Sequence, residues 1–154
     1  MDTQPHISVR RATVSDLDLL APLFDAYRQF YRKAADLSLA RRFLLERFQH
    51  NESVVFLALG EDGSAAGFTQ LFPSFSWGSA SRILILNDLF VAHTFRRMGV
   101  GRSLLHAAAS FGKTVGAVRL SLSTEVTNKA ARALYETSGW KPQTDFCVYD
   151  FFLR

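Results

Sequence analysis

Cysteine is nearly absent from this sequence, since Cys147 is the one cysteine among 154 residues. A single cysteine excludes an internal disulfide and is typical of a reducing compartment. No stretch approaches the roughly 20 apolar residues that a membrane-spanning helix needs. Polar Asp2 and His6 follow Met1 without an apolar run, so we expect no signal peptide. These absences predict a cytoplasmic protein with no membrane part.

The sequence also lacks a large excess of charge of either sign. The formal net charge is +4, and the basic residues are scattered apart from one turn near residue 97 and the pair Arg41–Arg42. So small and dispersed a charge permits an anionic ligand but disfavours nucleic-acid binding. Linkers, repeats and low-complexity segments are lacking too, and 154 residues are enough for one sizeable core. We therefore expect a single domain over residues 1–154.

Hydrophobic periodicity predicts the element order β-αα-β-β-β-α-β-α-β. The expected strands cover residues 7–10, 54–59, 66–72, 83–91, 118–123 and 146–153, and the segment 74–81, with Phe75 and Trp77, is expected to be a loop. The expected helices cover residues 17–34, 37–48 and 128–138, with another that ends near residue 113. Three successive strands exclude a purely doubly wound sheet. The fold class is therefore α/β (α+β): a mixed, mostly antiparallel sheet of about six or seven strands with helices on both faces.

The central feature of the sequence is the segment 83–113. An almost wholly apolar strand leads into a turn that contains Arg96, Arg97, Gly99 and Gly101, and an amphipathic helix follows. Two glycines separated by one residue allow a tight turn with exposed backbone amides. Amides at a helix N-terminus, with arginines beside them, favour phosphate groups. The segment therefore predicts a pyrophosphate site.

Two common phosphate motifs do not match this turn. A P-loop needs Gly-Lys-Ser/Thr, whereas Arg102 and Ser103 follow Gly101. A dinucleotide fingerprint needs a third small residue, where this sequence has Leu104, and belongs on the first strand of its unit. The pattern Arg96-x-x-Gly99-x-Gly101 after a Leu-Phe-Val strand end instead resembles the coenzyme A signature of the GNAT superfamily of N-acetyltransferases.

A second block supports the same resemblance. Asn128 opens a helix, Leu134-Tyr135 follows with Tyr135 seven residues on, and Ser138-Gly139-Trp140 ends the helix. Together the two blocks cover residues 83–140. The details Asn87-Asp88-Leu89 and Phe146-x-x-Tyr149 are most similar to the branch of diamine, D-amino-acid and histone-type N-acetyltransferases.

The resemblance implies acetyl-CoA as the cofactor. By resemblance, the end of the strand 83–91 hydrogen-bonds the pantetheine arm, the turn holds the pyrophosphate and Asn128 contacts the arm. Tyr135 is the candidate general acid toward the leaving thiolate. The expected cofactor-binding residues are Leu89, Phe90, Val91, Arg96, Arg97, Met98, Gly99, Val100, Gly101, Arg102, Ser103, Asn128 and Tyr135.

The general base is less defined. Some relatives have a glutamate where this sequence has Asn87, and an amide cannot take a proton. The base is then either absent or replaced by Asp88, which would bind the ammonium or act through a water. Equally, Asp88 is a structural carboxylate at a strand bulge, held by backbone amides.

By resemblance, the helical region after the first strand binds the amine acceptor, with Tyr27 and Tyr31 as candidates beside a core-packing role, and Asn87 is a further candidate. Trp77, on a loop, either lines the acceptor pocket or covers the core, and we expect no metal. The resemblance implies acetyl transfer to a primary amine of a small molecule by direct attack in a ternary complex, since no His or Asp accompanies Cys147 at a telling spacing. A protein or peptide acetyltransferase is the alternative, and a non-catalytic module that binds coenzyme A or a nucleotide is a further one. An exposed final strand leads us to expect a homodimer.

Overall fold

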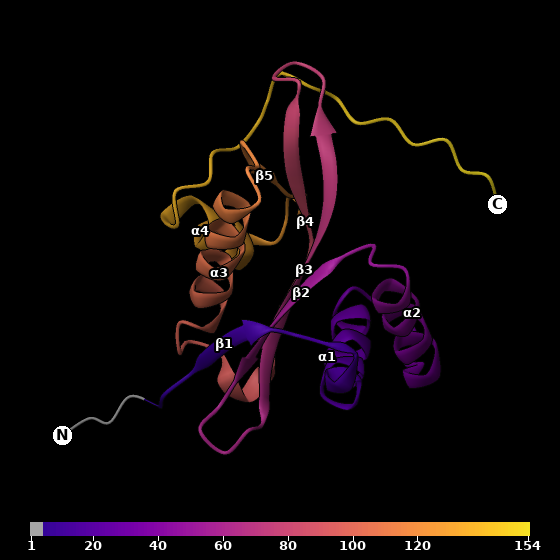
Figure 1. Cartoon of the computed structure of the whole chain (residues 1–154), viewed down its shortest axis with the longest axis vertical. Coiled ribbons are helices and arrows are strands. Elements are labelled where there is room, and N and C mark those ends of the chain that lie inside the picture. Colours follow the sequence, from indigo (N-terminus) through magenta and orange to yellow (C-terminus); the bar gives the residue numbers. More distant parts are fainter. Residues whose placement is uncertain (1–4) are drawn as a thin grey trace. The chain divides into compact units, whose positions relative to one another are not determined.

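A five-stranded sheet forms the centre of the larger of two compact units (Figure 1). The computed structural model describes residues 5–154. The units are Met1–Ser123 and Thr124–Arg154. The expectation of no signal peptide near Met1 falls partly on residues 1–4, outside the described residues. That residues 1–154 form a single domain stays a prediction.

The sheet is mixed and mostly antiparallel, as predicted, in the order β1-β2-β3-β4-β5. The first four strands pair antiparallel, and β5 runs parallel to β4. Among residues 5–154 there are five strands rather than the expected six or seven: β1 (Ser8–Arg11), β2 (Val54–Leu59), β3 (Ala65–Ser76), β4 (Ser81–Val91) and β5 (Leu120–Ser121).

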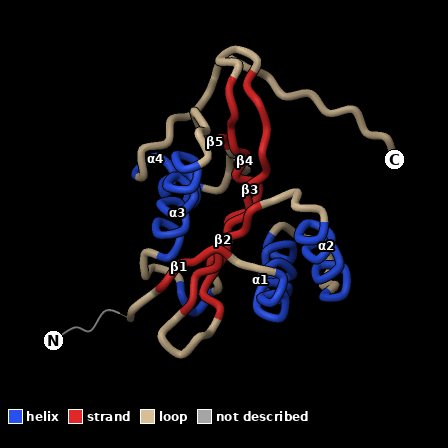
Figure 2. Tube along the Cα trace, in the orientation of Figure 1, coloured by secondary structure: helices blue, strands red, loops and turns tan. Residues whose placement is uncertain are grey.

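Helices lie on both faces of this sheet, which confirms the predicted layers (Figure 2). Leu57 of β2 packs in one core with α1 (Leu17–Phe30) and α2 (Leu37–Gln49). Ala58 packs in a second core with α3 (Val100–Thr114). Successive strand residues point to opposite faces, so β2 is buried on both. The short turns η1 (Val14–Asp16) and η2 (His93–Phe95) precede α1 and α3.

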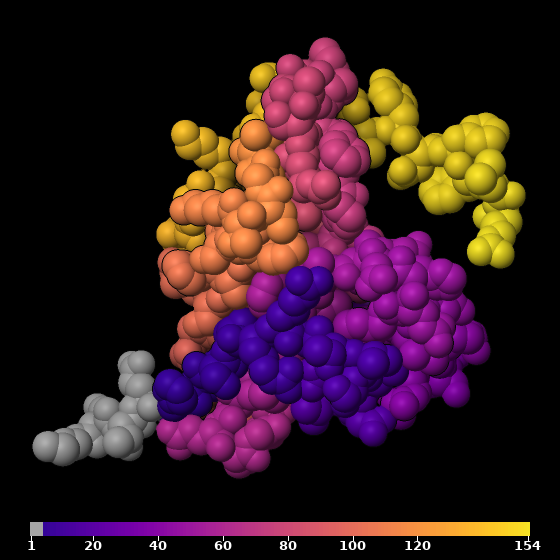
Figure 3. Space-filling view, viewed as in Figure 1, coloured from indigo at the N-terminus to yellow at the C-terminus, as the bar shows by residue number. Residues whose placement is uncertain are grey.

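The two helices on the first face pack side by side through aromatic rings. Phe24 of α1 stacks on Phe43 of α2 with centroids 5.3 Å apart and meets Phe68 of β3 edge-on at 6.1 Å. Figure 3 shows α1 and α2, coloured indigo to purple, as one continuous surface. In the part of the chain that the structure describes, no helix is both long and apolar enough to cross a bilayer.

The hairpin of β3 and β4 is longer than predicted. We expected β3 to stop before Pro73, but it continues to Ser76, and β4 begins at Ser81. The pairing of β3 with β2 ends at Leu71, so Pro73 has a strand neighbour on the β4 side alone. A proline there breaks no ladder hydrogen bond. The expected loop 74–81 is therefore a short turn with Trp77 at its tip.

The expected last strand over residues 146–153 is wrong. Residues 141–154 carry no secondary structure, and within the described chain no backbone hydrogen bond joins them to a neighbour. Their apolar side chains are 78–91% exposed. An alternating pattern suits a strand, but a strand forms only where a partner backbone pairs with it. The smaller unit thus contains the helix α4 (Lys129–Thr137) and an unpaired apolar segment.

Candidate active site

The turn before α3 has the backbone of an anion site. Gly99, the N-cap of α3, has φ 77°, and Arg97 has φ 65°, so two residues of the turn are left-handed. Ser103 N donates to Gly99 O at 3.0 Å. The amides of Val100 and Gly101 precede this bond and so have no acceptor within the helix. Since a Cβ on Gly99 would meet nothing within 4 Å, the space beside the turn is open.

The arginines of the turn are arranged differently from one another. The Arg96 guanidinium lies 5.7 Å from the Phe30 ring centroid and 5.8 Å from that of Phe90, and its Nε donates to Val91 O at 3.3 Å. It therefore joins the turn to α1 and to the end of β4. Arg97 and Arg102 are exposed on the turn and on the first turn of α3, where positive charge favours a bound phosphate.

The end of β4 has an open edge. In the described chain β5 pairs with β4 at Leu84 and Ile85 alone, so the later part of β4 has a strand partner on the β3 side only. Ala92 N donates to Ala66 O at 2.8 Å. Because backbone groups alternate in direction along a strand, those of Leu89 and Val91 face the open edge. This edge leads to the turn and fits an extended, amide-bearing arm such as pantetheine.

A β-bulge interrupts β4 before this edge. Gln70 of β3 pairs with Asp88, and Leu71 pairs with Leu86, so Asn87 is the extra residue. A bulge shifts the alternation of faces by one residue. Leu84, before it, lies against Gly112 of α3, whereas Phe90, after it, packs in the core of α1. The bulge therefore turns the side chain of Asp88 toward the α1 face.

The Asp88 carboxyl is buried and hydrogen-bonded. The residue is 6% exposed, and its Oδ2 accepts from Gln70 Nε2 at 2.8 Å. Burial raises the pKa of Asp88, and hydrogen bonds from Gln70, Tyr27 and Asn87 oppose that rise. The carboxyl is thus next to a bulge, as one of our two interpretations had it, but its hydrogen bonds come from side chains. A buried carboxyl with a raised pKa is suited to accept a proton.

Three of the four expected acceptor residues gather around the bulge. The Tyr27 hydroxyl donates to Asn87 O at 3.4 Å, and the Tyr27 and Tyr31 rings meet edge-on with centroids 5.2 Å apart. Trp77 does not join them. It is 93% exposed at the hairpin tip, beyond Ser76, and Ser76 is six steps along the strand from Gln70, about 20 Å at 3.3 Å per step.

The second sequence block forms the predicted local structure in the smaller unit. Asn128 caps α4, since its side chain accepts from Ala131 N at 3.1 Å. Gly139 ends the helix with φ 93°, and Trp140 N donates to Tyr135 O at 3.0 Å. The rings of Tyr135 and Trp140 lie 6.0 Å apart. The roles of Asn128 and Tyr135 toward a cofactor stay predictions.

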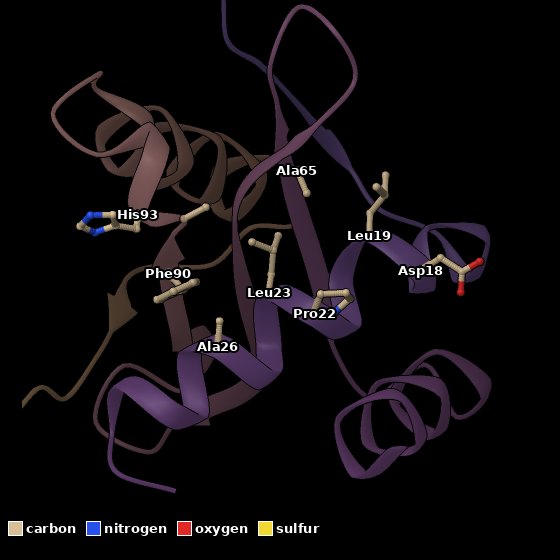
Figure 4. A pocket seen from close by; sticks show the side chains of 9 residues that line it. Asp18, Leu19, Pro22, Leu23, Ala26, Ala65, Phe90 and His93 are labelled. Carbon is tan, nitrogen blue, oxygen red and sulfur yellow. The ribbon is translucent and has the colours of Figure 1, made fainter. Parts of the chain in front are cut away.

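Sequence reasoning missed two features. The first is a cavity of about 350 Å³ between α1 and the end of β4 (Figure 4). The small side chains of Ala26, Ala65 and Ala92 are among those that line this space. Asp18 and His93 lie at its opposite ends (Figure 4). The second is Gln70, the partner of Asp88. Its polar side chain inside the apolar run 66–72 was the signal that could have revealed it.

Comparisons with known proteins found a matching family model, similar sequences and similar structures. A model described as "Acetyltransferase (GNAT) family" matches residues 20–140. The chain is 47% identical to the uncharacterized N-acetyltransferase YhfO of Bacillus subtilis over 143 residues, 93% of this chain and 95% of that protein. It is 28% identical to the aminoglycoside N(6')-acetyltransferase type 1 of Klebsiella aerogenes over 90 residues, 57% and 59% of the two chains. A crystal structure of a probable acetyltransferase superposes with a TM-score of 0.89 at 40% identity, over 96% of this chain and 98% of that one.

Proposed function

The chain belongs to the acetyltransferase (GNAT) family and is an acyltransferase that takes its acetyl group from acetyl-CoA, and from this premise we propose that it acetylates a primary amine of a small molecule. The observation that carries the proposal is the buried carboxyl of Asp88 beside Tyr27 and Asn87. A single carboxylate among aromatic rings suits an ammonium group on a compact ligand. The aminoglycoside-acetylating relative supports a small-molecule acceptor.

Each part of the site has a proposed task. The amides of Val100 and Gly101, with Arg97 and Arg102, bind the diphosphate of coenzyme A. The open edge at Leu89 and Val91 orients the arm by backbone hydrogen bonds. We assign the remaining expected cofactor contacts to Phe90, Arg96, Met98, Gly99, Ser103 and Asn128, on the family resemblance.

Acetyl-CoA, when bound, supplies a thioester carbonyl for attack by a neutral amine. Asp88 binds the ammonium form of the acceptor and takes its proton, directly or through a water. The amine nitrogen then bonds to the carbonyl carbon, and the carbon–sulfur bond breaks. Tyr135 gives its phenolic proton to the leaving sulfur, and the proton that the nitrogen loses as the amide forms returns through water to the Tyr135 phenolate. Asp88 releases the ammonium proton to solvent, so the products are the amide, the coenzyme A thiol and one proton. This is direct transfer, without an acetylated enzyme.

The experiment is an amine panel with acetyl-CoA and detection of the released thiol. The panel contains aminoglycosides, diamines, amino acids and a lysine peptide. We expect turnover with one of the small amines, and Tyr135→Phe should lower kcat by about 100-fold while acetyl-CoA binding persists. Turnover with the peptide alone would point to a protein acetyltransferase. If none of the amines in the panel causes thiol release, the chain would instead be a module that binds coenzyme A without catalysis.

A second control separates direct transfer from an acetylated enzyme. Intact-protein mass spectrometry after incubation with acetyl-CoA and no amine should show unmodified chain. Acetylation at Cys147, which is exposed, would contradict direct attack.

Three broader proposals accompany the activity. Because the family match 20–140 spans both units, we place them in one acetyltransferase domain. The exposed apolar segment 146–153 suits burial by a second copy of the chain, hence a homodimer. The free thiol of Cys147 suits the cytoplasm.

A further inference from the structure

A glutamine lies fully buried beneath the proposed acceptor site. Gln70 of β3 has 0% exposed surface and pairs across the sheet with Asp88. A buried amide is unfavourable unless its ends are hydrogen-bonded. Both ends are satisfied: Ser53 Oγ donates to Gln70 Oε1 at 2.7 Å, and Gln70 Nε2 donates to Asp88 Oδ2 at 2.8 Å. The amide thus links Ser53, just before β2, to the carboxyl of the bulge.

We propose that Gln70, fixed by Ser53, is a positioning residue that orients the Asp88 carboxyl toward the acceptor amine. This inference rests on the proposed function, in which Asp88 binds and deprotonates the amine. Gln70 itself is buried and acts through Asp88 rather than on the substrate.

The chemistry of Ser53, Gln70 and Asp88 fixes the direction of the two hydrogen bonds that join them. An ionised carboxylate can only accept, so the amide must turn its N–H toward Asp88. Its oxygen then faces Ser53, whose hydroxyl donates. Both hydrogen bonds therefore point toward the carboxylate, and each polarises the next. The arrangement occupies Oδ2 and leaves Oδ1 as the oxygen that Gln70 does not hold.

The backbone of Asp88 is fixed separately. Thr69 Oγ1, also fully buried, donates to Asp88 O at 2.8 Å. Thr69 thus anchors the main chain of the bulge, while Gln70 holds the side chain. The two neighbouring residues of β3 provide a pair for mutation: Thr69 loses one buried hydrogen bond, to the Asp88 backbone, whereas Gln70 loses two, one of which reaches the carboxyl.

The groups that act on the carboxyl come from three elements. Gln70 of β3 and Asn87 of β4 are neutral, and Tyr27 of α1 is titratable. The hydrogen bonds that act most on Asp88 therefore come from uncharged side chains. Of the hydrogen bonds that lower the pKa of Asp88, the one from Gln70 is the largest. Loss of Gln70 should therefore raise the pH needed to ionise the carboxyl.

The test compares Gln70→Met, Ser53→Ala and Thr69→Val with the wild type across pH 5 to 9. Methionine keeps most of the volume of glutamine without its hydrogen bonds. We expect Gln70→Met to move the acidic limb of kcat/KM for the amine to higher pH and to lower kcat/KM about tenfold at pH 6. The KM for acetyl-CoA should not change. Ser53→Ala should move the limb in the same direction by less, and Thr69→Val should leave it in place.

The half-buried position of Ser53 keeps the test available if Gln70→Met does not fold. An acidic limb that stays in place in both variants while the wild type turns over would overturn the role of Gln70.

A second readout does not depend on activity. The ¹³C signal of the Asp88 carboxyl, followed by NMR against pH without any substrate, should titrate at higher pH in Gln70→Met than in wild type. Equal titration would overturn the inference even in an active enzyme. If the wild type acetylates no amine, the proposed function fails, and the titration still decides whether Gln70 controls the carboxyl.

Discussion

Asp88 is the residue to which we assign the proton transfer from the amine. Its carboxyl is buried by Tyr27 and the sheet, and it is held by a neutral amide rather than by a cation. Such a carboxyl is destabilised in its charged form. A raised pKa is useful in a group that has to take a proton from an amine, and it carries a cost in stability at neutral pH.

The substitution Asp88→Asn tests both consequences. Because the folded-state pKa is raised above the unfolded value, the wild type is most favoured below the unfolded pKa of about 3.9 and loses that stability as pH rises through the folded pKa. Asparagine has no such dependence. We expect the melting temperature of the wild type, minus that of Asp88→Asn, to increase as pH falls from 8 to 5. A difference that stays constant would contradict a raised pKa.

The same variant should lose activity. Removal of a general base lowers kcat/KM for the amine on the order of 100-fold or more, with the KM for acetyl-CoA unchanged. Steady-state kinetics at pH 8 provide the measurement. Near-wild-type rates would make Asp88 a structural residue and would move the base elsewhere.

The first helix is joined to the sheet by a second carboxylate, Asp16, whose pKa is lowered rather than raised. Asp16, at the start of α1, accepts from Arg10 NH1 and NH2 at 2.8 and 2.7 Å and from Thr13 N at 2.8 Å. The Arg10 hydrogen bonds are the main reason that the pKa of Asp16 lies below its usual value. This contact joins the end of β1 to the start of the helix that carries Tyr27.

Substitution of Asp16 should act mainly on stability. Asp16→Asn loses the bidentate ion pair with Arg10, although its amide oxygen can still accept from Thr13 N, and should cost about 1–2 kcal/mol, a fall in melting temperature of roughly 2–8 °C. Since the folded pKa is lowered, the contribution is present above the unfolded pKa and disappears as pH falls through the folded one. Thermal melts should show a difference in melting temperature between wild type and Asp16→Asn at pH 7, and this difference should be smaller at pH 3. A gap of equal size at both values would assign it to packing instead.

The sheet and α3 meet closely at Gly67. A Cβ on Gly67 would lie 2.6 Å from Phe90 O and 3.3 Å from Val100 Cγ1. The first atom belongs to the backbone of β4, so the strand must move, and this is the stretch whose other edge we assign to the pantetheine arm. The glycine therefore connects the packing of three elements to the site.

We expect Gly67→Ala to displace the end of β4 and to weaken acetyl-CoA binding. The measurement is the shift in melting temperature on addition of acetyl-CoA. A ligand at 100 times its Kd adds about 2.7 kcal/mol to the free energy of unfolding. The shift should shrink relative to wild type, whereas Gly63→Ala, in the β2–β3 turn with nothing within 4 Å of its Cβ, should cost stability through its φ of 80° but leave the ligand shift intact. Equal ligand shifts in both variants would show that β4 tolerates the displacement.

At the scale of the whole molecule, the exposed apolar segment 146–153 favours association with a second chain. It exposes Phe146, Val148, Tyr149, Phe151, Phe152 and Leu153. A contiguous apolar stretch without paired backbone is unfavourable in water and prone to associate. We expect the chain to be a dimer in solution, with Val148→Lys/Phe152→Lys shifting it toward monomer. Light scattering coupled to size exclusion gives the masses. A monomeric wild type would remove the dimer from the proposal.

The sequence by itself determined the features that depend on near neighbours along the chain. These include the amphipathic helices, the glycine turn at 99–101 and the Asn128 cap, because each is set by local backbone preferences and by hydrogen bonds within a few residues. The order of elements, and with it the family resemblance, followed from these up to α4.

Only the tertiary structure decided what depends on a partner strand or helix. The bulge at Asn87 exists because of its register with β3, and it turns Asp88 toward Tyr27 and Gln70. Pro73 is tolerated because β2 has already ended, and Trp77 is carried away from the acceptor residues by the same long hairpin. Residues 146–153 have the pattern of a strand, yet they remain unpaired in the chain, because a strand is completed by hydrogen bonds that its own sequence cannot supply.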